Sequence, residues 1–153
     1  MSSTDHAFTA RLSWRRTTAD FAYDTYNRGH DVVVGSGVTL PSSAAPSFKG
    51  DASRINPEEM LLAALSSCHM LTFLAIAAKK RFVVDAYDDD ATAVMEKNEQ
   101  GKMAVTKATL RPRVRFSGEK QPTVDELSHM HHSAHENCFV ANSAKTVVDV
   151  VVG

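Results

Sequence analysis

Two cysteines, Cys68 and Cys138, are the side chains of this sequence best suited to chemistry. Two are too few for the disulfide framework of a small secreted domain or for a four-cysteine zinc site. In a reducing compartment, however, a cysteine pair is more often redox-active than structural. A buried cysteine can equally be an inert apolar side chain whose thiol pKa is raised by burial. The residues alone leave both interpretations open, a working thiol pair or two structural cysteines.

The residues around Cys68 predict a long helix. Asn56 is a suitable N-cap, Pro57 suits the first helical position, and the basic residues 79–81 match the negative end of the helix dipole. Apolar residues occur all round this segment rather than on one stripe. We therefore expect a central helix that is covered on most of its sides.

Glu58 lies ten residues before Cys68 in this predicted helix. Ten residues correspond to about 15 Å along a helix axis. They also correspond to a rotation of about 280°, so the two side chains do not share a face. A site that uses both residues therefore needs either a break in the helix or a second chain that brings its own Glu58.

A histidine-rich segment follows a second helix start, where Thr123 and Glu126 have the spacing of a capping box. The spacing of His131 or His132 from His135 can place two imidazoles on one helix face, and Cys138 could add a thiolate ligand. No HExxH motif is present. We expect no metal and interpret these histidines as a polar face, with zinc as the alternative.

Composition limits the class of protein. A chain of 153 residues predicts one domain, 1–153, and a net charge of −1 gives no support to nucleic acid or an anionic membrane as partner. The start of the chain lacks the pattern of a secretory signal, so we expect a cytoplasmic protein. The uncharged run 60–78 is nearly long enough to cross a bilayer. Polar residues at its middle favour a buried helix and no membrane span.

Hydrophobic patterning predicts an α+β fold with antiparallel sheets. Leu127, Met130 and Ala134, together with His131, give the second helix one apolar face. Segments that favour strands precede the first helix, separate the two helices and close the chain, which is typical of α+β rather than doubly wound folds. The predicted strands are 8–16, 31–40, 91–97, 103–116 and 145–152.

The segment NPEEMLLAALSSCH, residues 56–69, resembles the signature around the reactive cysteine of the OsmC/Ohr family (osmotically inducible protein C and organic hydroperoxide resistance protein). The segment HENC, residues 135–138, is similar to the one that carries the second cysteine of that family. The loop 40–46 favours the broader OsmC-like branch. This resemblance implies the OsmC-like fold, with antiparallel sheets around central helices, in an intertwined homodimer whose active sites lie between subunits.

The resemblance also implies a function. The chain would be a thiol-dependent peroxidase that reduces organic hydroperoxides to alcohols without a cofactor, and an external dithiol, lipoyl-type or other, would regenerate it. Cys68 would be the peroxidatic cysteine and Cys138 the resolving one. Glu58 would orient Arg28, and the guanidinium of Arg28 would hold Cys68 as a thiolate.

Two alternatives remain at this point. Arg54 and Arg16 are rivals of Arg28 for the role of the activating arginine. The rival function is a non-catalytic OsmC-like module that binds a ligand or carries a thiol.

Overall fold

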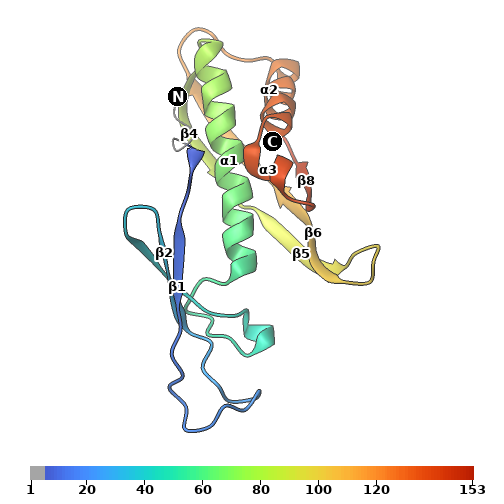
Figure 1. Ribbon diagram of the computed structural model, residues 1–153. Helices are drawn as coiled ribbons and strands as arrows, with labels where there is room; N and C mark the ends of the chain where they lie inside the picture. The colour runs from blue at the N-terminus through green and yellow to red at the C-terminus, as the bar shows by residue number, and fades with distance from the viewer. Residues whose placement is uncertain (1–5) are drawn as a thin grey trace. The chain divides into compact units, whose positions relative to one another are not determined.

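The computed structural model describes residues 6–153 and divides into two compact units, one up to Met60 and the other from Leu61 to Gly153 (Figure 1). Both units contain antiparallel strand pairs. Together with the helices, these strands make an α+β fold, as predicted. The single-domain organisation of 1–153 stays a prediction. The elements are β1 (Ala10–Ser13), β2 (His30–Val34), β3 (Val38–Ser42), α1 (Pro57–Lys79), β4 (Val83–Asp89), β5 (Thr92–Lys97), β6 (Met103–Leu110), β7 (Pro112–Ser117), α2 (Val124–Glu136), α3 (Phe139–Ser143) and β8 (Val147–Val150).

The first unit is built on an antiparallel sheet in the order β1-β2-β3. The prediction of one strand over 31–40 is wrong, because the chain turns between β2 and β3. Gly35 and Gly37 occupy this turn with φ of 55° and 119°, a backbone conformation that side chains with a Cβ rarely adopt. The turn converts one apolar run into a hairpin in which Val32 pairs with Leu40.

The loop after β3 is ordered by backbone hydrogen bonds. The amide of Ser43 donates to the carbonyl of Ile55 at 3.0 Å, and the amide of Ile55 donates to Pro41 at 3.0 Å. Gly50 comes so close to the backbone of Ala44 that a Cβ at this position would lie 1.6 Å from the carbonyl oxygen. The loop therefore delivers the chain to the start of α1 in a fixed conformation.

Two small sheets form the strand part of the second unit. β4 pairs with β7, while β6 lies between β5 and β8 and pairs with β8 in parallel. The prediction of one strand over 103–116 is wrong because the strand is interrupted at Arg111, whose amide donates to the carboxylate of Asp89 at 2.6 Å. Pro112 follows and has no amide to donate to a ladder. Sequence patterning also missed β4, whose apolar alternation is masked by Asp residues.

α1 begins at Pro57 as predicted, and Asn56 caps it. The amide of Glu59 donates to the Asn56 side chain at 2.8 Å, and the Glu59 carboxylate accepts from the Asn56 amide at 3.2 Å. The expectation that most sides of α1 are covered is wrong within one chain. The buried residues are spaced by four positions and form a single stripe, while Leu71 is 60% exposed. The stripe comprises Leu65, His69, Phe73 and Ala77.

α1 is long and apolar enough to cross a membrane by length and composition, a test that the core helix of a soluble protein also passes. Its Ser66 hydroxyl donates to the carboxylate of Asp89 in β4 at 2.5 Å. The stripe beyond it packs with Phe82, Met130 and Ala134 into the apolar core of the second unit. These contacts place one face of α1 in the core of the second unit.

A pair of histidines joins α1 to α2 inside this core. Nε2 of His69 lies 3.0 Å from Nδ1 of His131, and the rings are almost parallel, with their planes 3° apart. Both side chains are buried, and His131 also stacks on Phe73. Burial lowers the pKa of each imidazole from 6.5 to about 4. The nearby charge of His135 adds to this effect at His69, and the charge of His69 adds to it at His131. Each pKa therefore favours a neutral pair at neutral pH.

This pair predicts acid sensitivity. The unfolded chain binds more protons than the folded chain between about pH 6.5 and pH 4, so the pair's contribution to stability is present above this window and lost as the pH falls through it. The loss should be on the order of 3 kcal/mol for each imidazole that the fold holds neutral. Urea midpoints measured at several pH values should therefore fall steeply with acid in the native chain.

The matched variants are His131→Gln, which removes the buried imidazole, and His129→Gln, which removes an exposed one on the same helix. The pH dependence should flatten only in the first. Equal slopes for His131→Gln and the native chain would show that the pair does not carry the effect.

Candidate active site

The structure brings the two cysteines together. Cys68 lies half-buried in the middle of α1, and Cys138 is only 1% exposed at the N-cap of α3. Neither forms a disulfide, and each thiol lies close enough to the other to shift its pKa. Cys138 is buried in the turn between α2 and α3. The two thiols are neighbours.

The segment between α2 and α3 fixes the position of Cys138. The Cys138 amide donates to His135 at 3.3 Å, and the Asn142 side chain donates to the carbonyl of Glu136 at 3.2 Å. Sγ of Cys138 itself accepts from the Ala141 amide at 3.4 Å, as an N-cap side chain does. The capping box of Thr123 and Glu126 fixes the other end of α2, as predicted.

The two thiols differ in acidity. Partial burial alone would raise the pKa of Cys68, but the backbone of Val140, the Cys138 thiol and the backbone of Phe139 act as hydrogen-bond donors that outweigh burial and lower it. Burial and the hydrogen bond to Cys68 raise the pKa of Cys138. The arrangement therefore makes Cys68 the more acidic of the two thiols, which is the asymmetry of an attacking and a second cysteine.

Sequence reasoning missed the backbone donors. It required a positive charge near Cys68, because the start of α1 is too far away. The backbone amides of Phe139 and Val140 belong to α3, the five-residue helix that directly follows Cys138. The position of this short helix after Cys138 is the only sequence signal that could have pointed to these amides. They stabilise negative charge on Cys68 without any cationic side chain.

A pocket of about 560 Å³ opens beside Cys68. One wall is the α1 face, and the opposite wall is formed by Ser133, Asn137 and Phe139. In the α1 wall, the hydroxyl of Thr72 donates to the carbonyl of Cys68, one turn earlier in the same helix, at 2.8 Å. The pocket can bring a small apolar molecule to the Cys68 sulfur. The α1 wall comprises Cys68, Leu71, Thr72, Ala75, Ile76 and Lys79.

Glu58 lies in the first turn of α1, and α1 is continuous from Pro57 to Lys79. The helix therefore has no break that could bring Glu58 to Cys68. Of the two possibilities that the sequence left, only a second chain remains for a site that uses both residues.

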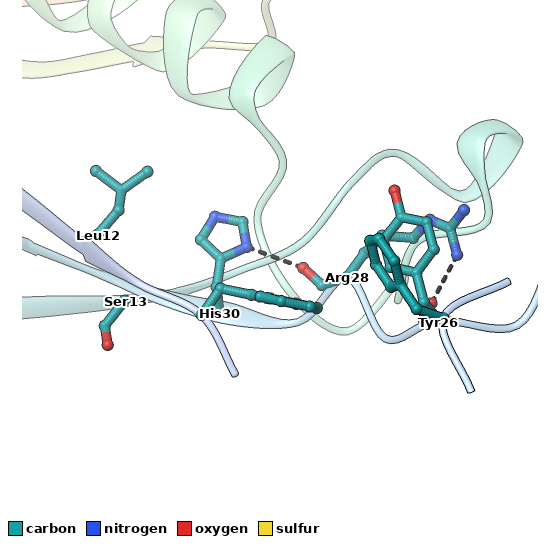
Figure 2. Close-up of a pocket in the computed structure, with 7 residues that line it drawn as sticks. Leu12, Ser13, Tyr26, Arg28 and His30 are labelled. Carbon is teal, nitrogen blue, oxygen red and sulfur yellow. Dashed lines mark hydrogen bonds between the residues drawn. The ribbon is translucent and has the colours of Figure 1, made fainter. Parts of the chain in front are cut away.

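Arg28 lines a separate pocket of about 460 Å³ within the first unit (Figure 2). Its guanidinium donates to the carbonyls of Tyr26 at 2.6 Å and Tyr23 at 2.5 Å and lies 3.7 Å from the centroid of the Tyr26 ring. The carbonyl oxygen of Arg28 lies 2.9 Å from Nδ1 of His30. A dashed line marks this contact in Figure 2. Among residues 6–153, Arg28 and Glu58 form no ion pair within one chain.

The rival arginines have other partners. Arg54 lies 3.5 Å from the carboxylate of Asp31 and 4.0 Å from that of Asp51. Arg16 donates to the carbonyls of Thr18 and Ala19 close by in sequence. Neither rival lines the pocket of Arg28.

The histidines do not form a metal centre in the part of the chain that the structure describes. Residues 6–153 hold no group of three or more His, Cys, Asp and Glu side chains placed to bind a metal ion. His131 is paired with His69, and Nε2 of His132 lies 3.1 Å from Glu136. The zinc alternative has no support in this geometry.

Comparison with known proteins identifies a family over the part of the chain that holds both cysteines. The family model described as OsmC-like protein matches residues 50–152. The chain belongs to the OsmC-like family. An OsmC-like protein of unknown function from Vibrio cholerae is 42% identical, with a TM-score of 0.91 over 96% of this chain and 99% of that one. The resemblance inferred from the sequence is confirmed.

Other OsmC-like and related structures share the fold at low identity. An OsmC-like protein from Mycoplasma pneumoniae is 14% identical, with a TM-score of 0.74 over 97% of both chains. An organic hydroperoxide resistance protein from Bacillus subtilis is 19% identical, with a TM-score of 0.62 over 95% of this chain and 96% of that one. No curated protein matches the chain.

The acidity of Cys68 should depend on the Val140 amide. Val140→Pro removes this donor at the second position of α3, where the fixed φ of proline is tolerated. The pKa of Cys68 should rise by roughly one unit, the size expected for losing one hydrogen bond to a charged group. The pH dependence of Cys68 alkylation, with Cys138 followed separately by peptide mapping, measures the change.

Val140→Ala is the matched control, since it shortens the same side chain and keeps the amide. An equal rise of the Cys68 pKa in both variants would show that packing, and not the backbone donor, sets the acidity.

Proposed function

We propose that this chain is a thiol-dependent peroxidase that reduces organic hydroperoxides through Cys68 and Cys138. The observation that carries the proposal is the adjacency of two thiols of opposite pKa shift beside an apolar pocket. Family membership supports it, because hydroperoxide resistance proteins from Legionella pneumophila and Bacillus subtilis share this fold.

The proposed chemistry needs two steps. The Cys68 thiolate attacks one peroxide oxygen, so that an S–O bond forms as the O–O bond breaks, and the alkoxide leaves as an alcohol after taking a proton. Cys68 is then a sulfenic acid. Cys138 attacks this sulfur, a disulfide forms and water leaves, which prevents further oxidation to sulfinic acid. The short path between the two thiols suits the second step.

Regeneration needs a reductant. An external dithiol, lipoyl-type or other, would attack the disulfide through a mixed disulfide and restore both thiols. This cycle fits a reducing cytoplasm.

We infer that the working unit is a homodimer. Its support is the uncovered surface of α1 and the exposed aromatic side chains of the first unit, since an apolar surface of this kind marks an interaction site. Phe8 is 91% exposed, Phe21 68% and Tyr23 67%. Glu58 and Arg28 would act on Cys68 across the subunit interface, with Glu58 orienting the guanidinium.

The first test is a thiol titration. Reduced protein treated with cumene hydroperoxide should lose two thiols per chain rapidly. Cys68→Ser should lose none, because the attacking sulfur is gone. Cys138→Ser should still react once, and excess peroxide should then drive Cys68 to sulfinic acid, seen as added oxygen mass on its peptide.

Cys68→Ser and Cys138→Ser are mutual controls, since each removes one sulfur from the same contact. Thiols that persist in the native chain would contradict the peroxidase and leave the non-catalytic ligand-binding module as the function.

Arg28 can be tested in the same reaction without reductant. Arg28→Ala should slow Cys68 oxidation at least about tenfold, the cost of losing a charged hydrogen bond to the thiolate. Arg28→Lys keeps the positive charge but lacks the planar guanidinium with its paired N–H donors, and it should recover part of the rate. A native rate in Arg28→Ala would transfer the role to Arg54 or Arg16.

A further inference from the structure

α3 is a short helix without a buried side chain. Its five residues, all within the part of the chain that the structure describes, include none that is buried, and Phe139 is 80% exposed. Isolated helices shorter than about 12 residues are marginal in water, so a helix of this length depends on bonds to the rest of the chain. The stability of α3 therefore comes from the few atoms that hold its first turn and tie it to α2.

The sulfurs of the cysteine pair are among these atoms. Sγ of Cys138 caps α3 by accepting from the amide of Ala141 at 3.4 Å. The amides of Phe139 and Val140 act as donors to the Cys68 sulfur. Because hydrogen bonds to an ionised acceptor are stronger than those to a neutral one, these amides bind the thiolate more tightly than the uncharged sulfur. The first turn of α3 is therefore sensitive to the chemical state of both cysteines.

Hydrogen bonds without sulfur also attach α3. The Asn142 side chain donates to the carbonyl of Glu136 at the end of α2 at 3.2 Å. The Asn142 amide donates to the carbonyl of Cys138 at 3.0 Å. Neither bond depends on the oxidation state of a cysteine. The sulfur contacts are therefore the part of the attachment that redox chemistry can change.

This first turn also encloses Cys138. The Cys138 side chain is 1% exposed, whereas Cys68 is half-buried and lines the pocket along α1. A thiol that reduces a disulfide must reach the sulfur that it attacks. With α3 in the position that the structure shows, the sulfur of Cys138 is closed to a reductant in solution.

We propose that α3 is a redox-sensitive lid on Cys138, closed while both cysteines are thiols and open once a disulfide joins them. In the disulfide the Cys68 sulfur carries no charge for the amides of α3 to bind, and Sγ of Cys138 is held by Cys68 rather than by its place in the cap. The first turn loosens, so a dithiol can reach the bond, and α3 closes again when both thiols are restored. The inference goes beyond the peroxidase, because any oxidant that forms the disulfide opens α3.

Hydrogen–deuterium exchange of backbone amides, followed by mass spectrometry, measures this opening. The disulfide is formed with diamide, an azo oxidant that takes two electrons and two protons from the thiols while one S–S bond forms. Both forms are quenched in acid with a phosphine reductant, so that the same peptides are compared. Amides of residues 139–144 should exchange at least about fivefold faster in the oxidised chain, the change expected when a helix loses its N-cap. Amides of α2 should keep their rates.

Cys138→Ala and Cys138→Ser are matched variants that separate the cap from the disulfide. Neither can form the bond to Cys68 within the chain, but the serine hydroxyl can accept from the Ala141 amide and the alanine methyl cannot. Without oxidant, residues 139–144 of Cys138→Ala should exchange about fivefold faster than those of the reduced native chain, the effect of a lost cap. Cys138→Ser should keep the native protection of these amides.

Equal or slower exchange of residues 139–144 in the oxidised chain would overturn the inference, because the disulfide would then hold α3 in place. Native protection in Cys138→Ala, a rise that extends over α1 and α2, or failure of diamide to join the two cysteines would overturn it as well. Cumene hydroperoxide tests the peroxidase separately. If it leaves both thiols intact while diamide opens α3, the peroxidase fails and the lid stands.

Discussion

The contact between Cys68 and the start of α3 is the interaction on which the rest of the account depends. It brings two backbone amides and a second thiol to the Cys68 sulfur, and together they lower its pKa. α1 holds Cys68, and the turn after α2 holds Cys138 as an N-cap. The packing of α1 against α2, including the His69–His131 pair, therefore fixes the distance over which a disulfide could form.

The sequence was sufficient for the parts that depend on local chemistry. Asn56 and Thr123 cap α1 and α2 where their types predicted, because a capping side chain satisfies amides within its own turn. The family was predicted from the amino-acid sequence of the segment around Cys68. The buried face of α2 was also predicted, including Met130 and His131, because it follows the helical period.

The parts that depend on contacts distant in sequence were not predictable. β4 is masked by its aspartates, one of which, Asp89, accepts hydrogen bonds from Ser66 and Arg111 in other segments. The backbone donors to Cys68 leave no residue-type signal, since any amide can serve. Glu58 and Arg28 form no ion pair with each other among residues 6–153 of one chain, so their roles stay predictions.

The most direct test of the central claim is peptide mapping under non-reducing conditions after one equivalent of cumene hydroperoxide. The account predicts one product, a disulfide that joins the peptides of Cys68 and Cys138 within the same chain, with the chain still running as a monomer on a denaturing gel. Cys68 oxidised to sulfinic acid beside a free Cys138 thiol, or two unmodified cysteines, would contradict it.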